Sequence, residues 1–125
     1  MYSAVVLDEK SKSKLLEKVG QLIPDNWVIY CHHMTINMGE LRPEQKRLVG
    51  LKVRLTVDAF GVGEKVLAVK CHADGINSDN ATPHITIAVD RMAGGKPVMS
   101  NQISKWYPIN RPLLLTGIVT EVEGN

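Results

Sequence analysis

Apolar and polar residues alternate over several stretches of this chain, which is the pattern of strands with one buried face. The clearest case is residues 51–60, where Leu, Val, Leu, Val and Ala occupy every second position. Further runs rich in Val, Ile, Leu and Thr predict strands over residues 3–7, 27–37, 65–73, 83–90 and 113–122. The two glycines in residues 61–64 predict a hairpin turn between the strands at 51–60 and 65–73.

Two segments predict helices. Apolar residues recur at three- and four-residue spacing from Leu15 to Ile23, capping residues precede them at 8–11, and Pro24 prevents continuation. Ser100 predicts the cap of a second, short helix over 101–106, after which Pro108 and Pro112 interrupt the chain. About six or seven strands and two helices indicate an α+β fold.

Length and composition predict one globular domain over residues 1–125. Hydrophobic residues make up 44% of the chain and charged residues 22%, which indicates neither a disordered nor a membrane protein. The net charge of +2 suits a small anion or one end of an RNA better than a long nucleic acid. No leader and no long apolar run is visible, so we expect a cytoplasmic protein.

One tetrapeptide pattern occurs twice, as His33-Met34-Thr35-Ile36 and as His84-Ile85-Thr86-Ile87, each within a predicted strand. Side chains alternate between the faces of a strand, so the His and Thr of each copy point the same way. Two imidazoles and two hydroxyls can then converge on one ligand. A tetrahedral phosphate suits such a set best.

Phosphodiester hydrolysis requires a base for the attacking oxygen, an acid for the leaving oxygen and donors for the phosphoryl oxygens. With an ordinary pKa of ~6.5, histidine populates both protonation states near neutral pH and can fill either proton-transfer role. The two threonines would bind the non-bridging oxygens. This scheme requires no metal ion and no cofactor, and it leaves open which histidine is the base.

The doubled His-x-Thr resembles the two-histidine (2H) phosphoesterases, which include RNA 2′,3′-cyclic phosphodiesterases and the phosphodiesterase domain of fungal tRNA ligases. The order of the predicted elements is similar over most of the chain: opening strand and helix, first motif, hairpin, second motif, closing strand. Residues 95–101 are also similar to the tRNA-ligase branch. The resemblance implies a bilobal α+β fold with few helices and two antiparallel sheet halves around a central cleft.

The resemblance also implies which residues act and on what. His33 and His84 would be catalytic, Thr35 and Thr86 would bind phosphate, and the reaction would open a 2′,3′-cyclic phosphate to a 2′-phosphate. The substrate would be an RNA 3′ end or a cyclic nucleotide, handled by a monomer beside an RNA-repair ligase or kinase. Two alternatives stay open, namely hydrolysis of cyclic oligonucleotide signals and a non-catalytic module that binds RNA ends or nucleotides.

Other residues are weaker candidates for the site. Lys96 and Ser100 follow the second motif on a glycine-rich loop and are candidate substrate contacts. His32 is expected to face away from His33 unless a bulge intervenes. Candidate contacts to the rest of an RNA are Arg42, Arg47, Lys52 and Arg54, and residues that would stack a base or pack in the core are Trp27, Tyr30, Trp106 and Tyr107.

The cysteines invite a zinc hypothesis that their spacing disfavours. Cys31-His32 and Cys71-His72 supply four ligand types, but adjacent residues on regular strands point to opposite faces. Free buried thiols are the simpler interpretation, since neither cysteine belongs to a C-x-x-C pair.

Overall fold

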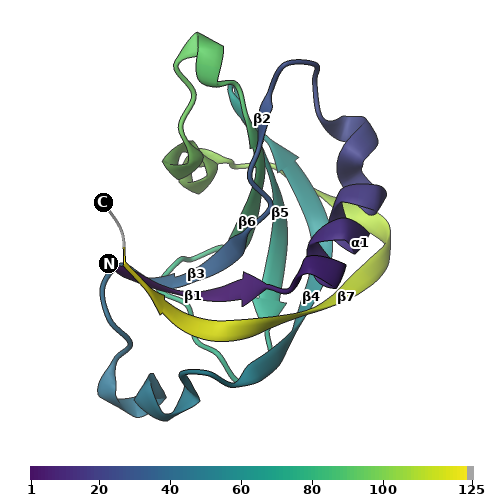
Figure 1. Ribbon diagram of the computed structural model, residues 1–125. Coiled ribbons are helices and arrows are strands. Elements are labelled where there is room, and N and C mark those ends of the chain that lie inside the picture. The colour runs from purple at the N-terminus through teal and green to yellow at the C-terminus, as the bar shows by residue number, and fades with distance from the viewer. Residues whose placement is uncertain (124–125) are drawn as a thin grey trace.

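A closed antiparallel sheet forms the main body of the protein (Figure 1). The computed structural model describes residues 1–123. Its strands are β1 (Tyr2–Leu7), β2 (Val28–Ile29), β3 (His33–Asn37), β4 (Lys52–Val62), β5 (Val66–Ala73), β6 (His84–Val89) and β7 (Trp106–Val122). They lie in the order β2-β6-β3-β1-β7-β4-β5, and β5 also pairs with β6, so that six strands close into a barrel. The predicted α+β class with antiparallel strands and few helices is confirmed.

The one α-helix in the described part of the chain is α1 (Glu9–Val19), which lies against the sheet beside β7 (Figure 1). It begins after Asp8, whose carboxylate accepts a hydrogen bond from the Ser11 amide at 2.7 Å. Its apolar side, including Leu15 and Val19, is buried, as the spacing predicts. Short 3₁₀ helices complete the structure at Gly20–Leu22, Pro43–Leu48, Arg91–Ala93 and Pro97–Gln102.

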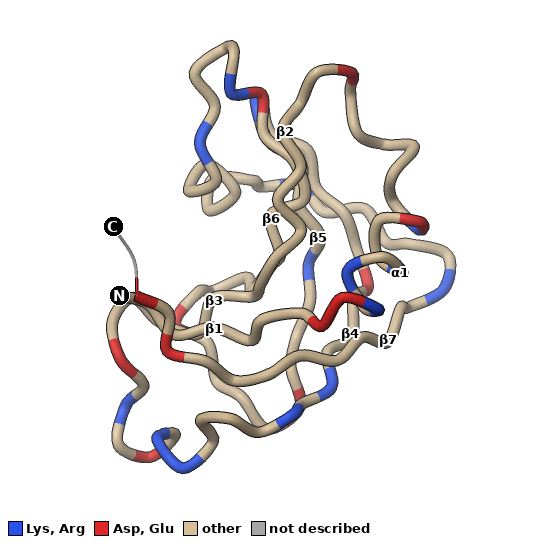
Figure 2. The backbone as a smooth tube through the Cα atoms, viewed as in Figure 1, with Lys and Arg blue, Asp and Glu red and all other residues tan. Residues whose placement is uncertain are grey.

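Strand alternation decides which side chains fill the core. On β4, Leu55, Val57 and Ala59 are buried as the period-two pattern predicts, and they pack inside the closed sheet. Leu51 was expected on the same face but lies just before the strand and is exposed. Lysine, arginine, aspartate and glutamate are absent from β3 and β6, which are tan along their whole length in Figure 2.

The strand predicted over residues 27–37 is wrong as a single element, because the chain breaks it into β2 and β3. Cys31 has a φ of 48°, in the left-handed region that ends a regular strand. The amides of Tyr30 and Cys31 still donate to the carbonyls of Ile87 and Thr86, at 2.8 and 2.9 Å. The kink therefore changes the direction of the side chains while the backbone stays bonded to β6.

The second predicted helix is also wrong. A 3₁₀ helix occupies Pro97–Gln102 instead, and β7 begins at Trp106 and runs through both Pro108 and Pro112. Pro108 pairs with Ala59, but the register of β4 then shifts, so that residues 109–112 bulge out of the ladder. Pro112 lies within this bulge, where the ladder needs no amide hydrogen bond, and Pro108 borders it.

None of the helices within residues 1–123 has the length and apolar character needed to span a membrane.

Candidate active site

The two motif strands meet at one residue pair, in which Met34 of β3 lies opposite Ile85 of β6. Both side chains are buried, with 1% and 0% of their surface exposed. Because neighbouring residues alternate between faces, the flanking His and Thr residues emerge on the other face of the sheet. Continuing the antiparallel register places His33 beside Thr86 and Thr35 beside His84.

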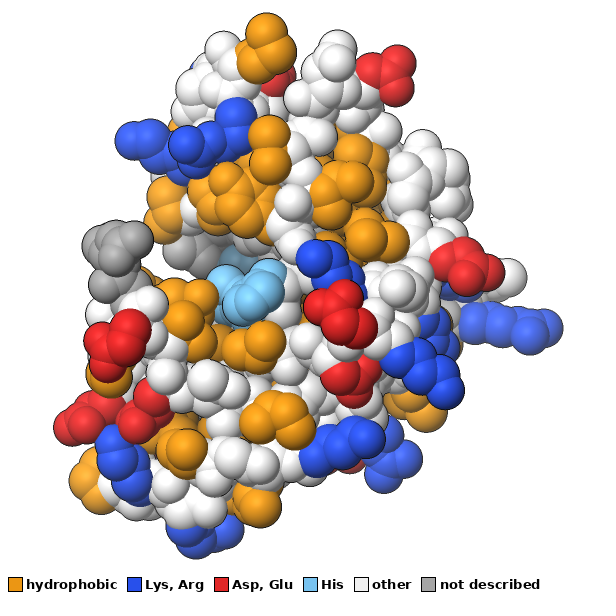
Figure 3. All heavy atoms as spheres, viewed as in Figure 1, with side chains coloured by type: hydrophobic (Ala, Val, Ile, Leu, Met, Phe, Trp, Pro, Cys, Tyr) orange, Lys and Arg blue, Asp and Glu red, His pale blue; other side chains and the backbone are white. Residues whose placement is uncertain are grey.

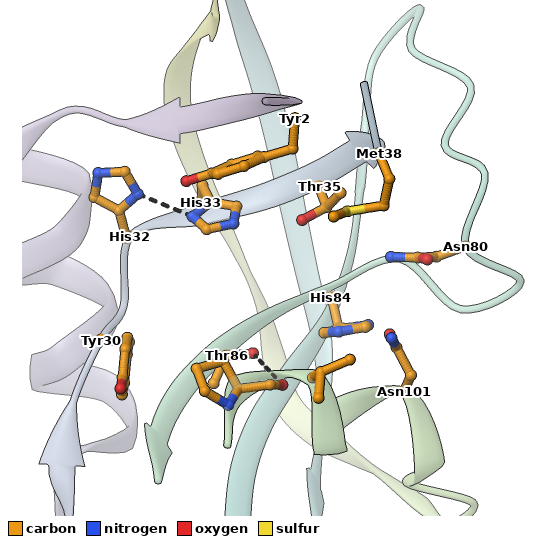
Figure 4. Close-up of a pocket in the computed structure, with 12 residues that line it drawn as sticks. Tyr2, Tyr30, His32, His33, Thr35, Met38, Asn80, His84, Thr86 and Asn101 are labelled. Atoms are coloured by element: carbon orange, nitrogen blue, oxygen red, sulfur yellow. Dashed lines mark hydrogen bonds between the residues drawn. The ribbon is translucent and has the colours of Figure 1, made fainter. Parts of the chain in front are cut away.

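These four motif residues line one cavity of about 440 Å³, shown in Figure 4. The structure thus brings together the two histidines and two threonines that the sequence pattern singled out. The remaining lining residues are Tyr2, Tyr30, His32, Met38, Asn80, Pro97, Val98 and Asn101. In the space-filling view, pale-blue histidine side chains lie at a hollow between apolar side chains (Figure 3). No lysine, arginine, aspartate or glutamate from the described residues lines the cavity, so its charge depends on its histidines.

His84 is held by its own chain. Its ring is 9% exposed, and Nδ1 lies 2.8 Å from the carbonyl oxygen of Thr82. A carbonyl oxygen only accepts hydrogen bonds, so Nδ1 carries the proton and donates it. Nε2 is then left to accept a proton or to donate a second one. The Trp106 ring packs beside this imidazole, with the ring centres 6.4 Å apart.

His33 lies between two other rings. Its Nδ1 is 2.9 Å from Nδ1 of His32, and the Tyr2 ring centre is 4.9 Å from its own. Burial, together with repulsion from His32 and His84 when these rings carry charge, lowers the pKa of His33 to about 4. At pH 7 the His33 imidazole is therefore neutral and retains a lone pair that can accept a proton.

Thr86 is oriented by a residue behind it. Its hydroxyl lies 2.8 Å from the hydroxyl of Ser100, which is 1% exposed, and 3.5 Å from the carbonyl oxygen of Pro97. Ser100, a candidate substrate contact, lies outside the lining of this cavity and lines an adjoining one together with His84. Lys96, the other candidate on this loop, is exposed and also lies outside the cavity lining.

Sequence reasoning missed several lining residues. Asn101 lies in the tract 95–101 that carried part of the family resemblance, so a signal for it existed. Asn80 lies between the strands predicted at 65–73 and 83–90, where nothing in the sequence indicated a site residue, and Tyr2 offered no signal either. The expectation that His32 faces away from His33 is wrong, because His32 lies before the first residue of β3 and is not part of the regular strand, and the two imidazoles contact each other.

The aromatic and arginine candidates lie in different parts of the structure, and only some of them are near the cavity. Among the aromatic residues, Tyr30 lines the cavity and Trp106 lines an adjoining one of about 330 Å³, which also includes His84. Trp27 packs against the core as predicted, whereas Tyr107 is 50% exposed and packs against Phe60 outside the core. Arg42 and Arg54 are occupied by ion pairs with Asp79 and Asp74, at 2.9 and 3.3 Å.

The cysteines are both buried free thiols. Burial raises the pKa of Cys31 to about 11 and raises the pKa of Cys71 as well, so both stay protonated at neutral pH. Within residues 1–123, no three side chains of His, Cys, Asp or Glu come together as a metal site.

Comparison with known proteins finds no matching family model and no matching curated protein. The function of this chain is therefore inferred from the residues of the cavity.

Proposed function

We propose that this protein is a metal-independent phosphodiesterase that opens the 2′,3′-cyclic phosphate of an RNA end or a nucleotide to a 2′-phosphate. The observation that carries this proposal is the convergence of His33, Thr35, His84 and Thr86 on one cavity. A ligand-binding module needs only donors for the phosphate, whereas an acid and a base on two strands suit proton transfer on both sides of phosphorus.

His33 serves as the general base in this proposal. Its pKa of about 4 leaves it unprotonated at neutral pH, which is the state a base requires. In Figure 4 its second ring nitrogen points away from His32 and toward the cavity. Nε2 of His33 would take a proton from water as the water oxygen bonds to phosphorus.

His84 serves as the general acid. Its Nδ1–H remains bonded to Thr82, so a proton that enters or leaves the ring does so at Nε2. As the bond between phosphorus and O3′ breaks, O3′ takes the Nε2 proton of His84, and the products are a 2′-phosphate and a free 3′-hydroxyl. Solvent then returns one proton to His84 and removes one from His33. Each proton transfer would supply about 10²–10⁴-fold in rate.

Thr35 and Thr86 hold the non-bridging oxygens. Their hydroxyls emerge on the same face as the two imidazoles, and a diester phosphate carries a single negative charge that neutral donors can bind. The cavity lining lacks carboxylates among its described residues, so no fixed negative charge opposes the phosphate. Ser100 keeps the Thr86 hydroxyl in place from behind.

The arrangement of the strands also supports the likeness to 2H phosphoesterases. One residue pair, Met34 with Ile85, joins β3 to β6, and on either side of it the sheet continues through longer ladders. We infer that these two parts correspond to the two lobes of that family and that the cavity corresponds to its central cleft. A monomeric, cytoplasmic protein acting in RNA repair beside a ligase or kinase is the setting we propose.

Turnover of three ligand classes in EDTA tests this proposal. The purified protein is incubated with an RNA that ends in a 2′,3′-cyclic phosphate, with nucleoside 2′,3′-cyclic phosphates and with cyclic dinucleotides, and the position of the product phosphate is determined. A 2′-phosphate from the first two is the expected product. Cleavage of cyclic dinucleotides alone would indicate degradation of signals instead, and tight binding without turnover would indicate a binding module.

A further inference from the structure

Two neighbouring imidazoles contact each other at the edge of the proposed site. The Nδ1 atoms of His32 and His33 lie 2.9 Å apart, and the rings meet nearly edge-on, at 81°. Neighbours on a regular strand would point to opposite faces. His32 lies just before β3 begins, next to the left-handed Cys31 at φ 48°, so the alternation of a regular strand does not apply to it.

The short distance fixes how protons are shared. Each neutral imidazole has one N–H donor and one acceptor nitrogen, so a bond between two Nδ1 atoms requires one donor and one acceptor. If His32 donates, the proton of His33 sits on Nε2 and no lone pair faces the cavity. If His33 donates, its Nε2 is free to accept a proton from water. The direction of this one hydrogen bond therefore decides whether His33 can act as a base.

We propose that His32 is a positioning residue, whose Nδ1 accepts the Nδ1 proton of His33 and so keeps His33 in the tautomer with an open Nε2. This inference rests on the function proposed above, because a base is needed only if the site transfers protons. His32 is exposed, so its own proton can reside on Nε2 in contact with solvent.

The same bond assists the reaction when His33 takes up the proton of water. The ring then becomes a cation with protons on both nitrogens, and its Nδ1–H continues to donate to His32. A hydrogen bond from a charged donor is about twice as strong as a neutral one, so the contact strengthens as charge develops.

No other described side chain is placed to accept the Nδ1 proton of His33. The ionisable groups that face His33 are His32 on the preceding residue, Tyr2 from β1 and His84 from β6, and the cavity lining contains no carboxylate from the described residues. Catalytic histidines are commonly oriented by a third group bonded to their far nitrogen. Here a neutral imidazole takes that place, so the effect on rate should be moderate.

Nitrogen-15 NMR of the histidine rings in the intact protein tests the proton placement directly. At pH 7 we expect the chemical shifts to report a protonated Nδ1 and an unprotonated Nε2 for His33, with the opposite tautomer for His32. A His33 ring protonated at Nε2 in an active protein would overturn the role of His32 and leave the proposed function standing. The expected tautomers in a protein without phosphodiesterase activity would instead overturn the proposed function, and with it the catalytic purpose of His32, while the proton placement would stand.

Variants of His32 supply a second test that does not depend on assignment of the rings. His32→Asn places an amide oxygen near the position of Nδ1 and keeps an acceptor, whereas His32→Phe keeps a ring without one. We expect kcat to fall about 10-fold in the Phe variant with little change in KM, and to stay near wild type in the Asn variant. His72→Phe, at an exposed histidine outside the cavity, is the matched control. Equal losses in the Asn and Phe variants would contradict the proposal.

Discussion

Met34 lies directly opposite Ile85, and this buried pair joins the two strands that carry the repeated motif. Its position between the His and Thr of each motif has two consequences. The two apolar side chains anchor the strands in the core, and the flanking polar side chains necessarily emerge together on the other face. One register therefore brings together all four residues of the proposed site.

Met34→Ala should destabilise the fold and disturb the site at the same time. Truncating a fully buried methionine leaves a cavity and costs about 2–5 kcal/mol. The control is Met92→Ala, because Met92 is 88% exposed and its truncation should leave stability nearly unchanged. Urea unfolding of both variants measures the difference, and similar midpoints for the two would contradict the assigned role of Met34.

Replacing either phosphate-binding threonine with valine should weaken catalysis without unfolding the protein. Thr35→Val and Thr86→Val keep the side-chain shape and remove one donor to a charged group, which corresponds to a loss of about 10- to 100-fold in kcat/KM. Thr120→Val is the matched control, since that exposed hydroxyl bonds only to a carbonyl of its own strand. Full activity in both site variants would remove the threonines from the phosphate site.

Ser100→Ala should have a smaller effect than Thr86→Val. The variant loses a buried hydrogen bond worth about 1 kcal/mol and frees the Thr86 hydroxyl to rotate, but it leaves the donor in place. We expect a lower kcat/KM together with a slightly lower melting temperature, and no change in the exposed control Ser104→Ala. A loss of activity larger than that of Thr86→Val would place Ser100 in direct contact with substrate.

The lowered pKa of His33 should make stability depend on pH. The folded protein protonates this ring near pH 4 and the unfolded chain near 6.5, so the unfolded state binds more protons in between. This contribution to stability is fully present above pH 6.5 and is lost as the pH falls toward 4. From pH 7 to pH 5, wild type should lose up to about 2 kcal/mol more unfolding free energy than His33→Gln. Parallel pH dependences of the two proteins would contradict a lowered pKa.

Period-two alternation was sufficient to predict β4, and runs of β-favouring residues between turns were sufficient to predict β5 and β6. The repeated motif was likewise sufficient to predict which four polar residues lie together. Both patterns follow from local strand geometry, in which residue spacing alone decides the face of a side chain.

The wrong predictions fall where contacts between distant segments, rather than local residue preferences, set the backbone conformation. Propensity gives no reason for Cys31 to adopt a left-handed conformation, and the kink depends on amide bonds from Tyr30 and Cys31 to β6. β7 likewise passes through Pro108 and Pro112 only because the register of β4 shifts beside them. No local pattern in the sequence reports either of these pairings.

The rest of the cavity lining depends on how the sheet closes. Tyr2 reaches His33 because β1 pairs with β3. Asn80 approaches His84 from the loop before β6, and Asn101 approaches it from the 3₁₀ helix Pro97–Gln102. Their positions are set by contacts between segments far apart in the chain. The role proposed for His32 likewise could not be predicted, since it requires β3 to begin at His33 rather than before His32.

The most direct test of the account is turnover, in EDTA, of an RNA ending in a 2′,3′-cyclic phosphate by wild type, His33→Ala and His84→Ala, with His72→Ala as control. The account predicts a 2′-phosphate product from wild type and from the control, and a loss of about 10²–10⁴-fold in kcat for each site variant. Circular dichroism of each variant would show whether it remains folded. Full activity in either folded site variant would contradict the proposed acid and base.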